Sequence, residues 1–317
     1  MHSLMRIGLD VMGGDFAPGA VIEGAIDTLP HLAPGEKLVL IGNESAIYSK
    51  LEESGKDPAL FDIIHAEEVI GMGEHPARAY SNKVRSSIAV GYSMLKNKEI
   101  HGFTSAGNTG AMLVGASYTV NVIPGVFRPA LATLLPSTED GRQTVLLDVG
   151  LNPDSKPDVL LQYARLGSLY ARYVLNIENP RVGLLNIGEE ESKGSIAVKS
   201  AFELMKDNPQ VNFTGNLEAN SLFTGDMPDV IVCDGFVGNI VIKEAEAFYT
   251  IYRKRGLKDD FFERLNFENI GGTPIVGINA NVVIGHGISK RKAIMNMILQ
   301  TRDVIKADLA QKIIEEI

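Results

Sequence analysis

The segment Ser105–Ala111, with the sequence SAGNTGA, carries residue types suited to binding an anion. It follows a short apolar run and precedes an apolar helical pattern, so its small side chains expose backbone N–H groups at a helix N-terminus. The partial positive charge of that terminus attracts phosphate. A plain helix cap would use the same residue types. The candidate phosphate-binding residues are Ser105, Gly107, Thr109 and Gly110, with Asn108 as a catalytic candidate.

A second glycine-rich turn closes the first apolar run, at Asp10–Asp15. Paired Gly13 and Gly14 permit a tight turn and a close approach of the backbone to a ligand. Asp10 could ligate a metal or orient the loop, and an aspartate that caps the following turn is the simpler interpretation. The turn does not match G-x-G-x-x-G, so no nicotinamide site is expected there. We include Asp10, Gly13 and Gly14 among the substrate-binding candidates.

Two lysines each follow a polar strand end. Lys156 comes after Asp148–Asn152, and Lys193 comes after the segment that contains Asn186 and Gly188. A lysine in such a place can neutralise phosphate or stabilise an oxyanion, although most lysines only solvate a surface. We predict that Lys193 is catalytic and that Lys156, Asn186 and Gly188 bind substrate.

Two further clusters contain candidate polar groups. The segment Cys233–Asn239 turns a strand into a glycine-broken loop before a helix, so Asp234 is a catalytic candidate and Gly235 and Asn239 are substrate-binding candidates. His286 lies between two glycines, which leaves its ring room to reach a ligand, so it is a further catalytic candidate, although it could equally be a structural loop residue.

No protein nucleophile is apparent in the sequence. G-x-S-x-G, H-E-x-x-H and the Walker A pattern are absent, and Cys233 lacks the electropositive neighbours of a reactive thiol. No metal site and no cofactor are expected. The remaining donors and cations suit the positioning of an oxyanion, which favours direct group transfer.

The clusters described above lie between short apolar runs, which we expect to be strands, and helical patterns. These strands and helices must position the clusters. Such alternation predicts an α/β fold with a mainly parallel sheet covered by helices on both faces, and the carboxyl ends of its strands are the usual ligand sites. Any one cluster alone could be an ordinary turn. The expected strands are Ile7–Met12, Lys37–Ile41, Phe61–His65, Gly102–Ser105, Thr144–Val149, Arg181–Ile187, Val211–Thr214 and Val230–Cys233. The expected helices are Ala20–Leu29, Ser86–Asn97, Val159–Leu175, Ser195–Lys206 and Ser289–Ala310.

Composition narrows the class of protein. The 317 residues are 45% hydrophobic and 22% charged, which is typical of globular proteins. A net charge of −9 without a long basic run argues against nucleic acid as a partner. One cysteine suits a reducing cytosol, and no apolar stretch is long enough to span a bilayer. The mixed segment Tyr249–Asn269 is expected to form an exposed, partly helical excursion, either a peripheral membrane or partner contact or a solvated helix pair.

Six motifs, taken together and in chain order, resemble those of the PlsX family, the bacterial acyl-ACP:phosphate acyltransferases. The resemblance runs from Ile7 to about Asn296, and six ordered motifs are far more specific than one glycine pattern. The motifs are Leu9–Asp15, Ser105–Ala111, Arg128–Ala130, Leu147–Gly150, Asn186–Glu190 with Lys193–Gly194, and Cys233–Asn239.

The resemblance implies transfer of a long-chain fatty acyl group from acyl carrier protein to inorganic phosphate. The acyl phosphate would then serve phospholipid synthesis through a membrane glycerol-3-phosphate acyltransferase. It also implies a homodimer and a three-layer fold akin to isopropylmalate dehydrogenases and phosphate acetyltransferases. We expect a main lobe of residues 1–125 with 272–317, which carries phosphate-binding strand ends, and a second lobe of residues 126–271 that includes the 249–269 excursion.

The sequence departs from the family pattern at two places. Leu151, Pro153 and Ser155 replace family residues after the Asp148 motif, and Ser155 stands where a cysteine is common, so no thiol is needed there. The segment between Asn239 and Gly271 is shorter than the family's amphipathic hairpin, which weakens the case for membrane contact. A CoA-dependent phosphate acetyltransferase, a metal- and NAD-dependent decarboxylating dehydrogenase and a non-catalytic scaffold are the alternatives, and no cluster of metal-binding aspartates supports the dehydrogenase.

Overall fold

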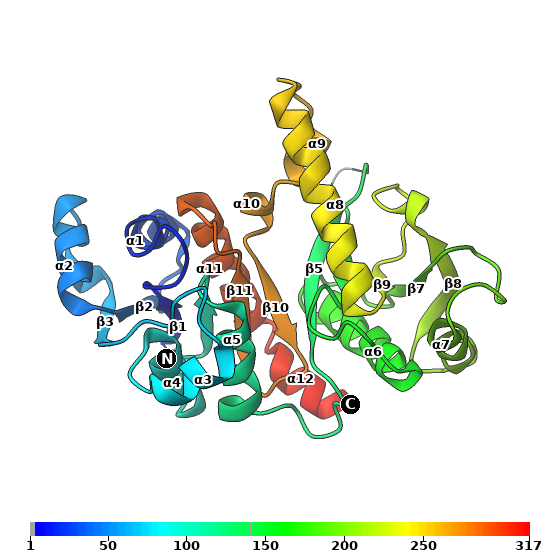
Figure 1. Ribbon diagram of the computed structural model, residues 1–317, viewed down its shortest axis with the longest axis horizontal. Helices are drawn as coiled ribbons and strands as arrows, with labels where there is room; N and C mark the ends of the chain where they lie inside the picture. The colour runs from blue at the N-terminus through cyan, green and yellow to red at the C-terminus, as the bar shows by residue number, and fades with distance from the viewer. Residues whose placement is uncertain (1–3, 140) are drawn as a thin grey trace. The chain divides into compact units, whose positions relative to one another are not determined.

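The computed structural model describes residues 4–139 and 141–317 (Figure 1). The chain packs into two compact units. The first contains residues 4–122, 268–274 and 278–306, and the second contains residues 123–139, 141–267, 275–277 and 307–317. The chain therefore passes between the units more than once.

The first unit is a sheet with its strands in the order β3-β2-β1-β4-β11-β10. All neighbours are parallel except β10, whose first three residues run antiparallel to β11. The strands are β1 (Met5–Asp10), β2 (Glu36–Gly42), β3 (Asp62–His65), β4 (Gly102–Ser105), β10 (Gly272–Val276) and β11 (Asn281–Gly285). The helices are α1 (Gly19–Thr28), α2 (Glu44–Glu53), α3 (Pro76–Asn82), α4 (Ser87–Lys96), α5 (Thr109–Gly115), with a π-helical turn at Ala116–Val120, and α11 (Arg291–Lys306).

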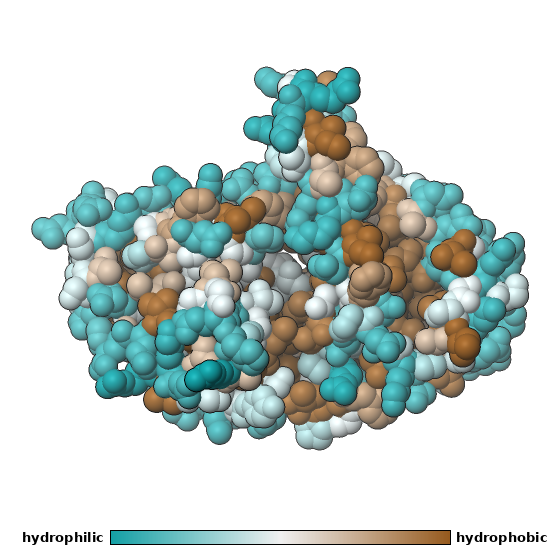
Figure 2. Space-filling model, in the orientation of Figure 1, coloured by the Kyte–Doolittle hydropathy of each residue, from teal (hydrophilic) through white to brown (hydrophobic). Residues whose placement is uncertain are grey.

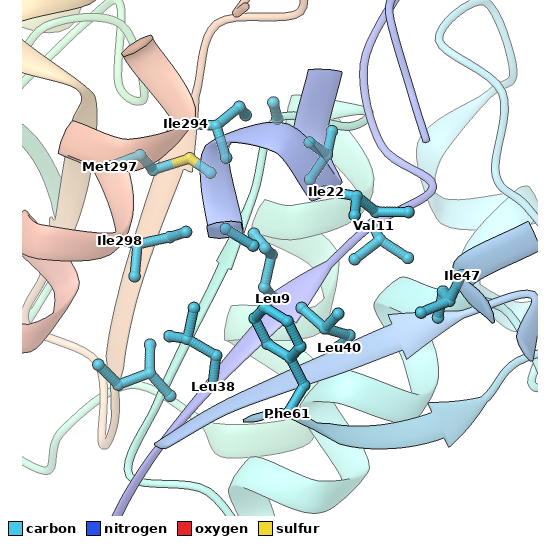
Figure 3. Close-up of a cluster of buried hydrophobic side chains, with 14 of the residues drawn as sticks. Leu9, Val11, Ile22, Leu38, Leu40, Ile47, Phe61, Ile294, Met297 and Ile298 are labelled. Carbon is cyan, nitrogen blue, oxygen red and sulfur yellow. The ribbon is translucent and has the colours of Figure 1, made fainter. Parts of the chain in front are cut away.

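The core of the first unit forms where α1 and α11 cover the central strands. Figure 3 shows Leu9 of β1 and Leu38 and Leu40 of β2 pointing toward side chains of both helices. Gly24 of α1 is needed for this contact, because a Cβ atom there would lie 2.6 Å from Cβ of Ile294 on α11. The packing fixes β1, and with it the loop that follows Asp10.

The second unit contains the end of β10 followed by β5-β6-β9-β7-β8. β5 runs antiparallel to both of its neighbours, and the other pairs are parallel. The strands are β5 (Ala130–Pro136), β6 (Gln143–Leu147), β7 (Arg181–Asn186), β8 (Asn212–Glu218) and β9 (Val230–Val232). The helices are α6 (Pro157–Tyr173), α7 (Ile196–Lys206), α8 (Gly235–Lys254), α9 (Asp260–Arg264) and α12 (Leu309–Glu316), while α10 (Phe267–Ile270) leads back to the first unit.

The predicted α/β class with a mainly parallel sheet is confirmed, and each expected strand lies within two residues of an observed one except at the end of β8. The predicted helix Ser289–Ala310 is wrong in extent. It ends at Lys306, and Asp308 adopts a left-handed conformation with φ 49° before α12 begins. Residues 307–317 belong to the second unit, whereas the sequence analysis placed them in the main lobe.

The segment 249–269 is partly helical, as expected. It contains the end of α8, which runs as one helix from Gly235 to Lys254, and α9, and within it Tyr252 is buried against Phe262 with ring centroids 5.0 Å apart. Over residues 4–139 and 141–317, every helix is too short or too polar to span a bilayer.

Candidate functional site

In the first unit, Asp10 organises the carboxyl ends of β1 and β4. Its side chain is 1% exposed, Oδ1 accepts a hydrogen bond from the Met12 amide at 2.9 Å, and Oδ2 accepts one from Ser105 Oγ at 2.6 Å. Ser105 Oγ in turn accepts from the Gly107 amide at 2.9 Å. Burial raises the pKa of Asp10, and these hydrogen bonds oppose that rise. Asp10 and Ser105 therefore hold the loops in place, and their polar atoms are already used within the protein.

Glycine is required where these two loops meet. A Cβ atom on Gly13 would lie 2.5 Å from Asp10 Oδ2 and 2.6 Å from the Gly107 nitrogen, closer than any real Cβ contact. Gly14 has φ 104°, in the left-handed region that favours glycine. The structure thus brings Asp10, Gly13 and Gly107 together, and their contacts are with one another, so a role for them in binding substrate stays a prediction.

Asn108 caps α5 and also ties down a distant loop. Its Oδ1 accepts from the Ala111 amide at 3.0 Å. Its Nδ2 lies 3.0 Å, 3.2 Å and 3.1 Å from the carbonyl oxygens of Gly71, Met72 and Glu74, to which it donates. At 4% exposure the side chain has no polar atom left for a substrate. The geometry favours a positioning role over the catalytic role we predicted.

The remaining candidates of the first unit surround this loop. Thr109 is exposed at the start of α5, whereas Gly110 packs against Pro76, where a Cβ atom would lie 2.3 Å from Cγ. His286 is exposed just beyond β11, which runs parallel to β4. The carbonyl of the next residue, Gly287, accepts from the Asp15 amide at 2.8 Å. The predicted residues of the first unit therefore gather at one sheet edge.

In the second unit, Asp148 plays the part that Asp10 plays in the first. It is fully buried at the end of β6, where Oδ1 accepts from the amides of Leu131 and Leu151 at 2.9 Å and 3.2 Å. Oδ2 accepts from the backbone amide of Asn152 at 2.6 Å. Burial raises the pKa of Asp148, and these hydrogen bonds oppose that rise. Asp148 was not among the predicted site residues.

The N-terminus of α8 packs directly against this carboxylate. A Cβ atom on Gly235 would lie 2.7 Å from Asp148 Oδ2, and one on Gly238 would lie 1.9 Å from the Asp148 carbonyl oxygen. Asp234 caps α8, since its Oδ1 accepts from the Val237 amide at 2.8 Å. Asp234 is only partly buried, and Asn239 is exposed one turn along the helix. Both side chains keep polar atoms toward solvent at this edge.

The end of β7 lies beside the end of β9. Leu184 pairs with Val232, so Asn186 and Asp234, each two residues further on, leave the sheet as neighbours. Asn186 donates from Nδ2 to the Lys193 carbonyl at 3.2 Å and thereby closes the loop that carries Lys193. The methylene stem of Lys193 covers Gly188, where a Cβ atom would lie 2.8 Å from Lys193 Cγ.

Lys193 is a free cation at this edge. Its side chain is exposed, and it forms no ion pair with any described residue. Asn186 and Lys193 thus lie on the loop after β7, and Asp234 and Asn239 lie at the start of the helix after the neighbouring strand β9; that these strand ends bind a ligand stays a prediction. A charged amine here can approach an anion without first breaking a salt bridge.

Lys156 lies elsewhere along the edge of the second unit, at the N-terminus of α6. It lines a cavity of about 330 Å³ together with Arg128 and Asn152. The sequence analysis quoted Arg128 within a motif but did not predict it as a site residue. Its place here depends on the structure, because β5 runs antiparallel to β6 and therefore starts beside the end of β6.

Neither Cys233 nor Ser105 is placed to act as a nucleophile. Cys233 is buried, and burial, followed by the charges of Asp234 and Asp148, raises the pKa of its thiol. Ser105 is buried beneath the Asp10 contact. Within the described part of the chain, no three His, Cys, Asp or Glu side chains are grouped so that they could hold a metal ion.

Comparison with known proteins identifies the family of the chain. The family model described as "Fatty acid synthesis protein" matches residues 5–312. The chain is 39% identical to the phosphate acyltransferase of Dictyoglomus turgidum over 330 residues, covering 98% of this chain and 97% of that protein. It is 40% identical to the phosphate acyltransferase of Heliobacterium modesticaldum over 334 residues, with 99% and 98% covered.

Two solved structures share the fold at low identity. The phosphotransacetylase of Streptococcus pyogenes matches with a TM-score of 0.64 and 18% identity over 95% of this chain and 94% of that one. A branched-chain phosphotransacylase from Enterococcus faecalis matches with a TM-score of 0.64 and 12% identity over 95% and 99%. These likenesses confirm the predicted phosphate acetyltransferase-like fold. On the sequence matches, the chain is an acyltransferase and belongs to the fatty acid synthesis protein family, the PlsX family of phosphate acyltransferases.

Proposed function

We propose that the protein transfers a long-chain fatty acyl group from acyl carrier protein to inorganic phosphate, giving acyl phosphate. The observation that carries the proposal is the full-length match to phosphate acyltransferases at 39% and 40% identity. The burial of Cys233 and of Ser105 supports direct attack by phosphate on the thioester carbonyl. A carbon–oxygen bond forms, the carbon–sulfur bond breaks, and the carrier thiolate leaves and takes up the proton released by phosphate.

Lys193 is the residue we assign to the developing charge in this reaction. Its exposed, unpaired amine at the end of β7 would balance the phosphate or the oxyanion of the tetrahedral intermediate. Asp234 and Asn239 lie at the same edge and supply polar groups for the bound substrate. The first-unit loop from Ser105 to Gly110, with Thr109 exposed, is a second place where backbone amides can meet an anion.

The product would enter phospholipid synthesis through a membrane glycerol-3-phosphate acyltransferase. The protein itself would be a cytoplasmic homodimer that contacts the membrane peripherally. Exposed apolar side chains along α8 support a contact surface of this kind (Figure 2). Phe236, Ile240, Phe248 and Ile251 fall within roughly 120° of the helix circumference at 100° per residue. Light scattering tests the dimer, and flotation with anionic liposomes tests the membrane contact.

The decisive assay is phosphate-dependent release of carrier thiol from palmitoyl acyl carrier protein, with acyl phosphate detected by mass spectrometry. We expect both products in equal amounts and none without phosphate. Acetyl-CoA serves as the competing donor. Turnover of acetyl-CoA alone would assign the protein to CoA-dependent acetyl transfer, and binding of carrier protein without turnover of any thioester would indicate a scaffold. An acyl group trapped on the enzyme in rapid-quench mass spectrometry would contradict direct attack.

A further inference from the structure

The second unit contains a cavity of about 330 Å³ beside the N-terminus of α6. Its wall is built from two segments that meet because β5 is antiparallel to β6, namely the residues before β5 and those after β6. The first segment contributes an aromatic ring and a guanidinium, and the second contributes an amide, an amine and two carboxylates. These side chains belong to Phe127, Arg128, Asn152, Asp154, Lys156 and Asp158.

The two cations in this wall are free to bind an anion. Arg128 and Lys156 are exposed, and neither forms an ion pair with any described residue. Asp154 and Asp158 line the same cavity, but neither lies within 4 Å of a described cation. An arginine offers a planar fork to phosphate oxygens and a lysine offers a point charge, so the pair is suited to one phosphate group.

The N-terminus of α6 also lies at the cavity. α6 is 17 residues long, its N-cap residue, Lys156, makes no capping hydrogen bond through its side chain, and Asp158 lies in its first turn. The two cations and the partial positive charge of the helix N-terminus are therefore set beside the carboxylates of Asp154 and Asp158, which gives the cavity a mixed polarity.

A buried tyrosine lies behind the cavity wall. Tyr163 is 0% exposed, and its hydroxyl makes no hydrogen bond to a described residue. Burial raises the pKa of Tyr163, as does the charge of Asp148, while Ser155, Arg128 and Asn152 are close enough to oppose the rise. Because Ser155, Arg128 and Asn152 line the cavity and Tyr163 does not, the tyrosine backs the wall and is not itself a ligand-binding group.

The size and mixed polarity of the cavity distinguish between possible ligands. An inorganic phosphate ion would fill only part of a space at the lower end of the range for small-molecule sites, which is about 300–1,000 Å³. A longer ligand would use all of the lining. Its phosphate would meet Arg128 and Lys156, its amide and hydroxyl groups would meet Asn152 and the carboxylates, and its apolar part would pack on Phe127, which is 63% exposed.

We infer that this cavity binds the phosphopantetheine arm of the thioester donor. The inference rests on the proposed function, since a thioester donor carries this arm whether it is attached to a carrier protein or to coenzyme A. The arm combines a phosphodiester, two amides, a hydroxyl and a dimethyl-substituted carbon, which match the lining group by group. Arg128 and Lys156 would then determine affinity for the donor and leave affinity for inorganic phosphate unchanged.

The test separates binding from turnover. Calorimetric titration of the full-length protein with 4′-phosphopantetheine should show binding that Arg128→Ala and Lys156→Ala each weaken about tenfold, as expected for loss of one charge-assisted hydrogen bond. In steady-state assays the same variants should raise KM for palmitoyl acyl carrier protein and for palmitoyl-CoA by a similar factor, with KM for inorganic phosphate unchanged. A larger effect on the CoA donor would identify coenzyme A as the source of the arm.

Lys199→Ala, an exposed lysine on α7, is the matched control and should change neither quantity. Thermal melts confirm that each variant is folded, and Lys156→Arg should restore binding if charge alone matters. Unchanged titrations in both alanine variants would overturn the inference, as would a rise in KM for inorganic phosphate alone. Titration by 4′-phosphopantetheine without turnover of any thioester would uphold the cavity and reject the proposed function.

Discussion

Ser105 Oγ lies 2.6 Å from Asp10 Oδ2, and this buried hydrogen bond joins the carboxyl ends of two adjacent parallel strands. The second unit contains an equivalent device, in which Asp148 at the end of β6 accepts hydrogen bonds from Asn152 and lies against Gly235 at the end of β9. In each unit a buried aspartate fixes the start of the helix that follows the neighbouring strand. The exposed polar groups at each edge are thus displayed on loops that the aspartate holds rigid.

Replacing Ser105 with alanine should destabilise the first unit. The change removes the donor to Asp10 and the acceptor for the Gly107 amide, and both partners stay buried. We expect a loss of about 1–3 kcal/mol in the free energy of unfolding, measured by urea titration. Ser93→Ala on the exposed face of α4 is the control and should leave the midpoint unchanged. Equal stability of both variants would mean that water replaces the lost contacts.

The contribution of Asp10 to stability should depend on pH. Because burial raises its pKa above the usual 3.8, the folded state holds the proton more tightly than the unfolded state. The stability that Asp10 contributes is therefore greatest below pH 3.8 and is lost as pH rises through the folded pKa. Asp10→Asn stays neutral throughout, so the difference in unfolding free energy between wild type and variant should shift in favour of the variant from about pH 4 upward. A shift in the opposite direction would show that hydrogen bonds outweigh burial.

Much of the fold could be predicted because local pattern and tertiary structure agree. Parallel strands buried on both faces read as apolar runs, so β1, β2, β4 and β7 stand out in the sequence. β5, β10 and β11 were not predicted. β10 begins with Gly272 and contains Pro274, and both residue types are more common in turns than in strands. Only its antiparallel pairing with β11 and β5, which the sequence does not show, identifies it as a strand.

The polar clusters at strand ends were predictable from the sequence, but the contacts of their side chains were not. Clusters at strand ends indicate where polar groups gather. The sequence cannot show which of those groups form hydrogen bonds with residues far away in the chain and are therefore not free to bind a ligand. Asn108 is the clearest case, since its amide is used by carbonyls 34 to 37 residues earlier in the chain. Arg128 is the reverse case, because its place beside Lys156 depends on the antiparallel direction of β5.

Substituting Asn108 with aspartate tests whether the amide group is a tether. Aspartate keeps the acceptor that caps α5 but replaces the donor with an oxygen that faces the carbonyls of Gly71, Met72 and Glu74. We expect a loss of about 2 kcal/mol or more in unfolding free energy and faster proteolysis of the 70–74 segment. Asn43→Asp, at the N-cap of α2, is the matched control, because there only the acceptor is used. If both variants keep their stability, the donor is not needed and capping alone explains Asn108.

Gly238→Ala should be among the most damaging single substitutions in the second unit. The added Cβ atom would lie 1.9 Å from the backbone oxygen of Asp148, and neither the helix nor the strand end can yield without moving the other. We expect a loss of more than about 2 kcal/mol in unfolding free energy, or no soluble protein. Gly73→Ala, where no atom lies within 4 Å of the added carbon, is the control and should fold normally. A normally stable Gly238→Ala protein would mean that α8 can shift away from β6.

Lys193→Ala should lower turnover without affecting the fold. Its amine is exposed and unpaired among the described residues, so little stability depends on it, whereas the proposed transfer reaction uses its charge at the reacting centre. We expect kcat with palmitoyl acyl carrier protein to fall by about 100-fold, the scale of losing one electrostatic stabiliser of an oxyanion, at an unchanged melting temperature. Lys199→Ala on the neighbouring helix should keep full activity. A fall in activity for both lysine variants would point to the overall charge of this surface, and an active Lys193→Ala enzyme would remove Lys193 from the mechanism.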